Sequence, residues 1–130
     1  MIAIDTNLIV RFLLADDAAQ TKKVESFFGK QQGASWGYIN NIVICELFWI
    51  LKTVYRLSRE QIANMIENLL KTSDLQFQDE ELCSFALTDY RNGQDFADSL
   101  IGHINIKSQC TTTYTLDRLA SELDSFTLLH

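Results

Sequence analysis

The chain has 130 residues, 47% of them hydrophobic, and its 11 basic and 17 acidic side chains give a net charge of −6. This length predicts a single domain, 1–130, with a real hydrophobic core, and the hydrophobic fraction excludes a disordered chain. The negative charge argues against a nucleic-acid partner bound through a basic surface. That objection weakens if several carboxylates surround a divalent cation.

Strands that alternate with helices are predicted from periodicity and from turn residues. Strands are expected at 2–5, 34–39, 75–77, 111–115 and 126–129. Helices are expected at 8–14, 18–30, 59–71 and 96–109, and two more run from caps at Asn41 and Asp79 to Tyr55 and about Arg91. Ser58 and Gln61 form a capping-box pattern before the helix at 59–71. The order predicts an α/β sandwich with a mostly parallel sheet.

No segment of the sequence predicts export or a membrane partner. The longest apolar run, 42–51, is interrupted by Glu46 and is shorter than the roughly 20 residues that span a bilayer. Cys45, Cys83 and Cys110 are odd in number and stand among apolar residues, which predicts reduced, buried thiols. We therefore expect a soluble, cytoplasmic protein.

Four acidic side chains stand in apolar sequence surroundings: Asp5, Glu46, Asp98 and Asp117. Asp5 and Asp117 follow predicted parallel strands, whose carboxyl ends form the usual functional edge of such a sheet. Glu46 is the only charge in a helix that is apolar nearly all round, which predicts a buried carboxylate. A buried carboxylate without a partner costs several kcal/mol. A shared divalent cation would offset that cost, and an oxygen-only ligand set favours Mg²⁺ or Mn²⁺.

Each acid also has a simpler interpretation taken alone. Asp5 is a possible helix cap, and Asp98 lies near a first helical turn, where the dipole favours negative charge. Asp95 is the better cap of that helix, and we favour this role or a supporting one beside the site. Glu46 is interpretable as a paired core acid, and Asp117 as the residue that opens a turn.

Motifs along the whole chain resemble those of PIN-domain proteins, and specifically the small VapC-type ribonuclease toxins of toxin–antitoxin pairs. The matching stretches are IDTN followed by LIVRFLL, ICELFWIL, LSREQI, DFADSLI and YTLDR. Leu116 departs from the pattern, where relatives often carry Phe, and the stretch GASWGYIN around Trp36 has no counterpart that we can interpret. The resemblance implies a three-layer sandwich whose central sheet has about four or five strands flanked by helices.

The resemblance also implies an activity, namely metal-dependent endoribonuclease cleavage with Mg²⁺ or Mn²⁺ as cofactor. Asp5, Glu46, Asp98 and Asp117 match the acidic quartet of the family. Thr6, Asn7 and Thr115 match small polar positions beside it, from which hydroxyl groups could hydrogen-bond the carboxylates. The implied partners are an RNA substrate, a cognate antitoxin protein and a second copy in a homodimer.

Residues for substrate contact are less clearly indicated. Arg11, Lys52, Arg56 and above all Arg118, which adjoins Asp117, are candidates for holding RNA phosphates, but we favour an ordinary solvated charge for each. Trp36, Tyr38 and Trp49 could stack on bases, but we favour core packing for them. His103 follows Asp98 by five residues and so lies on a different helix face, and we expect no catalytic role for it.

Three other functions are alternatives to a toxin nuclease, and the sequence argues against the first two. A receiver-type phosphoryl acceptor would need an acidic pair after the first strand and a lysine ending a late strand, and IAID and TTTYTL supply neither. A PIN-like binding module without catalysis would have lost some of the acids. A PIN nuclease that acts on DNA or in RNA processing is not distinguished from a toxin by sequence.

Overall fold

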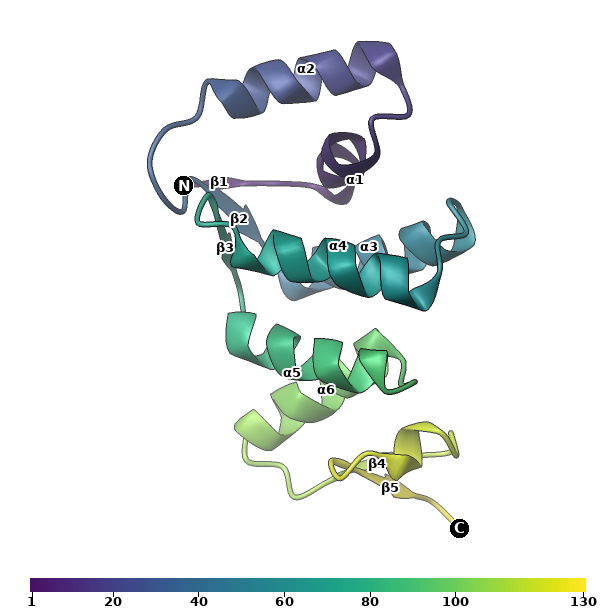
Figure 1. Ribbon diagram of the computed structural model, residues 1–130. Helices are drawn as coiled ribbons and strands as arrows, with labels where there is room; N and C mark the ends of the chain where they lie inside the picture. Colours follow the sequence, from purple (N-terminus) through teal and green to yellow (C-terminus); the bar gives the residue numbers. More distant parts are fainter. The chain divides into compact units, whose positions relative to one another are not determined.

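The computed structural model describes residues 1–130, and the chain divides into two compact units, Met1–Glu80 and Glu81–His130 (Figure 1). We call them the N-terminal unit and the C-terminal unit. Each unit has helices and its own small parallel sheet. None of the helices is both long and apolar enough to cross a lipid bilayer.

The N-terminal unit is built on a three-stranded parallel sheet. Its strands are β1 (Ile2–Ala3), β2 (Gly37–Ile39) and β3 (Leu75–Phe77), paired in the order β1-β2-β3. Ile2 is opposite Gly37, and Gly37 is in turn opposite Leu75. A Cβ atom on Gly37 would lie 2.7 Å from Cδ2 of Leu75, so a larger residue here would require the Leu75 side chain to move.

Two helical connections return the chain to the start of the next parallel strand. The helices are α1 (Thr6–Leu14) and α2 (Ala18–Gly29) between β1 and β2, and α3 (Asn41–Thr53) and α4 (Arg59–Lys71) between β2 and β3. Helix α3 packs against both α1 and α4. Its buried side chains recur at helical spacing and are Val43, Ile44, Leu47, Phe48 and Leu51. The facing stripe of α4 contains Ile62, Ala63, Ile66, Leu69 and Leu70.

The C-terminal unit pairs two helices with a two-stranded sheet. Its elements are α5 (Glu80–Arg91), α6 (Phe96–Lys107), β4 (Thr113–Thr115), a 3₁₀ turn (Ala120–Glu122) and β5 (Phe126–Leu128). Strands β4 and β5 are parallel, with Thr113 opposite Phe126. A side chain at Gly102 of α6 would overlap Ser125 and Phe126, so glycine lets α6 approach the start of β5.

The expected alternation of helices and parallel strands is confirmed, but a central sheet of four or five strands is not what the two units contain. The strands are shorter than predicted at 2–5, 34–39 and 111–115. The strands are shorter because only the residues of β1, β2 and β4 stand opposite a partner in a neighbouring strand, and the flanking β-branched and apolar residues lie in connections.

Two local predictions were also wrong. Helix α3 is capped by Asn40 and not by Asn41, because the Asn40 side chain accepts the N–H of Val43 at 2.9 Å. All three cysteines are reduced thiols as expected, but only Cys83 is buried, whereas Cys45 is half-buried and Cys110 is exposed. Cys110 follows α6 and the turn at 108–109, in a segment at the surface, so the apolar residues near it in sequence do not bury it.

The capping box before α4 is confirmed and gives a test of the fold. The Ser58 side chain accepts the N–H of Gln61 at 3.1 Å, and the Gln61 side chain accepts the N–H of Ser58 at 2.9 Å. Ser58→Ala should lower the free energy of unfolding by about 1 kcal/mol in urea denaturation, because it leaves an N–H group of the first turn unpaired. Ser73→Ala, at an exposed serine outside any helix, is the control and should change it by less than about 0.5 kcal/mol. Equal effects of the two substitutions would contradict the capping assignment.

Candidate functional site

Asp5 lies where β1 leads into α1, at the carboxyl edge of the N-terminal sheet. Its backbone has the extended conformation of an N-cap (φ −81°, ψ 158°), and its carbonyl oxygen accepts the N–H of Leu8 at 3.2 Å. Its side chain, however, makes no capping hydrogen bond and is exposed. The interpretation of Asp5 as a side-chain cap is therefore wrong, and so is the apolar setting expected for it. The carboxylate is left available to a ligand.

Glu46 lies on the exposed face of α3, and the prediction that it is buried was wrong. The same face carries Ile42 and Trp49, which are 71% and 65% exposed. Positions 42, 46 and 49 follow one another at helical spacing, opposite the buried stripe of the helix. The helix reads as apolar all round because its exposed face is also largely apolar, so sequence composition did not reveal which face is inside.

Other polar side chains gather at the same carboxyl edge of the N-terminal sheet. The backbone N–H of Asn41 donates to Oε1 of Gln78 at 3.0 Å, and Nδ2 of Asn41 donates to Oδ2 of Asp79 at 2.9 Å. These bonds join the end of β2 to the end of β3. They also give Asp79, which the sequence suggested as a helix cap, a partner on another element.

Asp95 is the N-cap of α6, as predicted. Its Oδ2 accepts the backbone N–H of Asp98 at 2.9 Å. Asp98 is therefore held in the first turn of the helix, where it is half-buried. Burial raises the pKa of Asp98 above its usual range, and the neighbouring carboxylates of Asp95 and Asp117 raise it further.

Asp117 follows β4 and opens a turn, as its simpler interpretation predicted. Oδ1 accepts the N–H groups of Leu119 at 2.8 Å and Ala120 at 3.1 Å, while the N–H of Asp117 donates to Oγ1 of Thr115 at 3.0 Å. Thr115 thus supports Asp117 through its backbone and not through its carboxylate. Oδ2 of Asp117 accepts no hydrogen bond within the chain, so one oxygen is fixed and the other is available.

A buried amide holds the two acidic segments of the C-terminal unit together. Gln94 is 7% exposed, and its Nε2 donates to the carbonyl oxygen of Leu119 at 2.9 Å. This bond ties the residue before Asp95 to the turn that Asp117 opens. The structure therefore brings Asp95, Asp98 and Asp117 near one another, which is why their charges act on the Asp98 pKa.

The other two acids of the predicted quartet, Asp5 and Glu46, belong to the N-terminal unit. Within neither unit do three acidic, histidine or cysteine side chains converge as ligands of a metal ion. Beside Asp5, Thr6 is buried, and its Oγ1 has no hydrogen-bond partner. Asn7 is exposed and faces a groove between α1 and α2.

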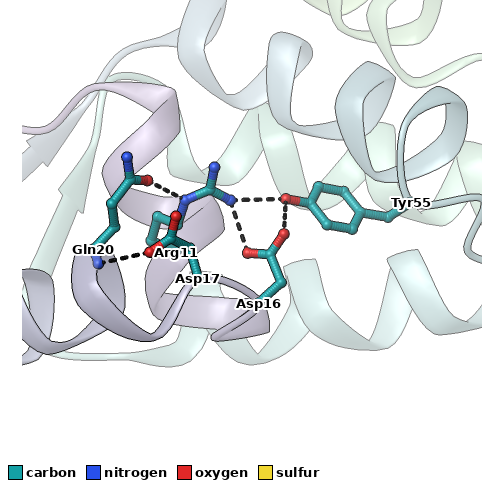
Figure 2. Close-up of polar contacts among 5 residues, drawn as sticks. All are labelled: Arg11, Asp16, Asp17, Gln20 and Tyr55. Atoms are coloured by element: carbon teal, nitrogen blue, oxygen red, sulfur yellow. Dashed lines mark hydrogen bonds and ion pairs between the residues drawn. The ribbon is translucent and has the colours of Figure 1, made fainter.

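Arg11, a predicted phosphate ligand, is the centre of a hydrogen-bond network (Figure 2). Its Nη1 donates to Oδ1 of Asp16 at 2.8 Å and to the hydroxyl of Tyr55 at 2.9 Å, and its Nε donates to Oε1 of Gln20 at 2.5 Å. The Tyr55 hydroxyl donates to the other Asp16 oxygen at 2.7 Å. The pKa of Asp16 is lowered by its hydrogen bond with Tyr55 and by the charge of Arg11. The pKa of Arg11 is raised by its hydrogen bond with Tyr55 and by the charge of Asp16. The network ties α1, α2 and the end of the α3 segment together.

The remaining candidates for RNA contact differ in exposure. Lys52, Arg56 and Arg118 are exposed. Trp36 is half-buried, with its ring 5.2 Å from that of Phe28 at an interplanar angle of 72°, so it packs within the N-terminal unit. Tyr38 is also half-buried, whereas Trp49 is exposed and is not a core residue.

A half-buried polar cluster of Asp89, Ser99 and His103 was missed by the sequence interpretation. Oδ2 of Asp89 on α5 accepts the hydroxyl of Ser99 at 2.5 Å and lies 3.0 Å from Nε2 of His103, both on α6. His103 is thus engaged with Asp89 through Nε2. The three residues belong to two helices and show no local spacing signal, so only the packing of α5 on α6 reveals them.

Comparison with known proteins leaves the family unassigned. No model of a known protein family matches the chain. A search of curated proteins also finds no significant match. The resemblance to PIN-domain toxins therefore stands on the quoted motifs alone.

The raised pKa of Asp98 makes stability depend on pH. A carboxyl group whose pKa is higher in the folded state contributes stability below its unfolded pKa of about 3.9, and this contribution is lost as the pH rises through the folded value. Asp98→Asn should therefore raise the free energy of unfolding at pH 7 by on the order of 0.5 kcal/mol, after allowance for solvent screening. The gain should disappear near pH 3.5, in urea denaturation at both pH values.

The same substitution at Asp124, an exposed aspartate of this unit, is the control. It removes one negative charge without changing the cluster of Asp95, Asp98 and Asp117, so it should not reproduce the gain at neutral pH. A loss of stability at pH 7 in Asp98→Asn would contradict the assignment, because it would show that the Asp98 charge is not destabilised by burial and by its acidic neighbours.

Proposed function

We propose that the chain is a metal-dependent endoribonuclease that hydrolyses RNA phosphodiester bonds and serves as the toxin of a type II toxin–antitoxin pair. The observation that carries the proposal is the gathering of Asp95, Asp98 and Asp117, where burial and, after it, the charges of the other two carboxylates raise the pKa of Asp98. Carboxylates held near one another against their repulsion are typical of sites that bind a cation or act in catalysis. The motifs DFADSLI and YTLDR around these acids resemble those of a nuclease family, with Leu116 as a departure, and this resemblance supports the proposal.

The donor set fits a hard divalent cation. On the resemblance, Asp5, Glu46, Asp98 and Asp117 are the residues that would hold Mg²⁺ or Mn²⁺, and all four offer only oxygen atoms. Asp5 and Glu46 are exposed, and Oδ2 of Asp117 is not engaged within the chain. When bound, such a cation lowers the pKa of a coordinated water and withdraws negative charge from a phosphate oxygen.

The chain's own residues hold the acids in position. Asp95 fixes the first turn of α6 and with it the backbone of Asp98, and Thr115 fixes the backbone of Asp117. The buried Thr6 hydroxyl lies next to Asp5 in the chain and has no partner, so it is able to donate to a ligand or to a carboxylate. Such supporting hydrogen bonds set the orientation of the groups that touch the substrate.

The toxin role extends this proposal to partners. A cognate antitoxin protein and a second copy of the chain in a homodimer are the partners that the resemblance implies. Ile42 and Trp49 on the exposed face of α3 support the presence of a protein partner in this region, because exposed apolar side chains beside one another are typical of interaction surfaces.

The activity is tested by cleavage of a mixed RNA pool with the purified chain in Mg²⁺, in Mn²⁺ and in EDTA. We expect metal-dependent cleavage that Asp5→Asn reduces by about 100-fold or more, since a ligand to the metal is lost. Asp5→Asn should leave the fold intact, because the Asp5 side chain caps no helix. Circular dichroism and thermal unfolding check this directly.

Asp74→Asn is the matched control, at an exposed aspartate of the same unit and outside the quartet. It should cleave like the original chain. Absence of cleavage by the folded, antitoxin-free chain with either metal would overturn the proposal. So would cleavage that persists in Asp5→Asn at the level of the control.

A further inference from the structure

A groove of about 440 Å³ lies between α1 and α2 of the N-terminal unit. Its lining includes Asn7 and Arg11 from α1, and Gln20, Lys23 and Phe27 from α2. Asn7 is two residues after Asp5, so the groove begins beside the first proposed metal ligand. Its volume is in the range of small-ligand pockets, which is room for a single nucleotide and far too little for a duplex.

The Arg11 guanidinium is held in a fixed plane at this groove. Nε and Nη1 are occupied by Gln20, Asp16 and Tyr55, while the second terminal nitrogen, Nη2, makes no hydrogen bond (Figure 2). The side chain is 27% exposed. A guanidinium that is already ordered loses little conformational entropy when it binds a phosphate oxygen, so Nη2 is a prepared donor.

Lys23 gives the groove its net positive charge. The ion pair with Asp16 offsets the charge of Arg11, whereas Lys23 is exposed. The groove is lined by two cationic groups and no carboxylate, although the chain as a whole has a net charge of −6. An anionic ligand is therefore the one that its charge favours.

Phe27 adds an aromatic surface. Its ring is in edge contact with Trp36, with centroids 6.1 Å apart and an interplanar angle of 80°, and it lies 6.0 Å from the ring of Phe28. These contacts fix the ring while leaving it half-buried and part of the groove lining. Cations for phosphate, an aromatic face for a base, and side-chain amides for base edges are the elements of single-strand recognition.

We infer that the α1–α2 groove binds one unpaired nucleotide of the RNA substrate, next to the bond that is cleaved. Lys23 and Nη2 of Arg11 contact its phosphate groups, and Phe27 stacks on its base. The side-chain amides of Asn7 and Gln20 face the edge of the base. This inference rests on the proposed nuclease function and adds to it the site that selects single-stranded over duplex RNA.

The test is the binding of a fluorescein-labelled pool of short single-stranded RNA, followed by anisotropy in EDTA so that no cleavage occurs. Lys23→Gln should raise Kd about fivefold and reduce the slope of log Kd against log salt concentration by about 0.7. Lys23→Arg should restore both. Lys22→Gln is the matched control, because Lys22 is the adjacent exposed lysine and does not line the groove, and it should change Kd by less than about twofold.

Binding and cleavage distinguish this inference from the proposed function. Metal-dependent cleavage together with equal effects of Lys23→Gln and Lys22→Gln on binding would overturn the groove assignment and leave the nuclease in place. Binding that depends on Lys23 without cleavage under either metal would overturn the nuclease and keep the groove as an RNA-binding site. No binding of single-stranded RNA, or equal binding of duplex RNA, would overturn the groove assignment outright.

Discussion

The three strands of the N-terminal sheet run parallel, so the chain must cross back over the sheet before each new strand begins. Each crossover here is a pair of helices, and all three strands end at the same edge. This constraint places Asp5, Asn40 and Gln78 at one carboxyl edge, although they are distant in sequence. The edge of a parallel sheet is where backbone geometry leaves room for ligands. Asp5 is an exposed aspartate at that edge whose side chain caps no helix, so its carboxylate is available to a ligand.

Repulsion between carboxylates is the second constraint, and it acts in the C-terminal unit. Asp98 is held by the cap that Asp95 provides, and the turn at Asp117 is tied back by the buried amide of Gln94. The fold thus half-buries Asp98 and keeps like charges near it, and both effects raise its pKa, burial the more. A bound cation would attract these carboxylates and offset their mutual repulsion. This attraction is the physical basis of the proposed metal-dependent activity. The α1–α2 groove adds a place for the substrate without adding acids.

Local features of the fold were predictable from sequence, and features that depend on packing were not. The capping box of Ser58 is complete within four residues, and so is the cap at Asp95, so both were found. Asn40 and Asn41 are chemically equivalent as caps, and the choice between them depends on the bonds of Asn41 to Gln78 and Asp79 across the sheet. Glu46 was misplaced because both faces of α3 are apolar. The network of Arg11 joins residues up to 44 positions apart, and no spacing rule reveals such a contact.

The most direct test of the central claim is a titration of the full chain with Mn²⁺, followed by the electron paramagnetic resonance signal of the free ion. If the carboxylates form a cation site, the chain binds Mn²⁺ saturably, Mg²⁺ competes, and Asp5→Asn and Asp98→Asn each weaken binding about tenfold or more. Asp74→Asn should bind as the original chain does. Absence of saturable binding, or equal binding by all these variants, would contradict the account and leave the repulsion at Asp98 without a functional explanation.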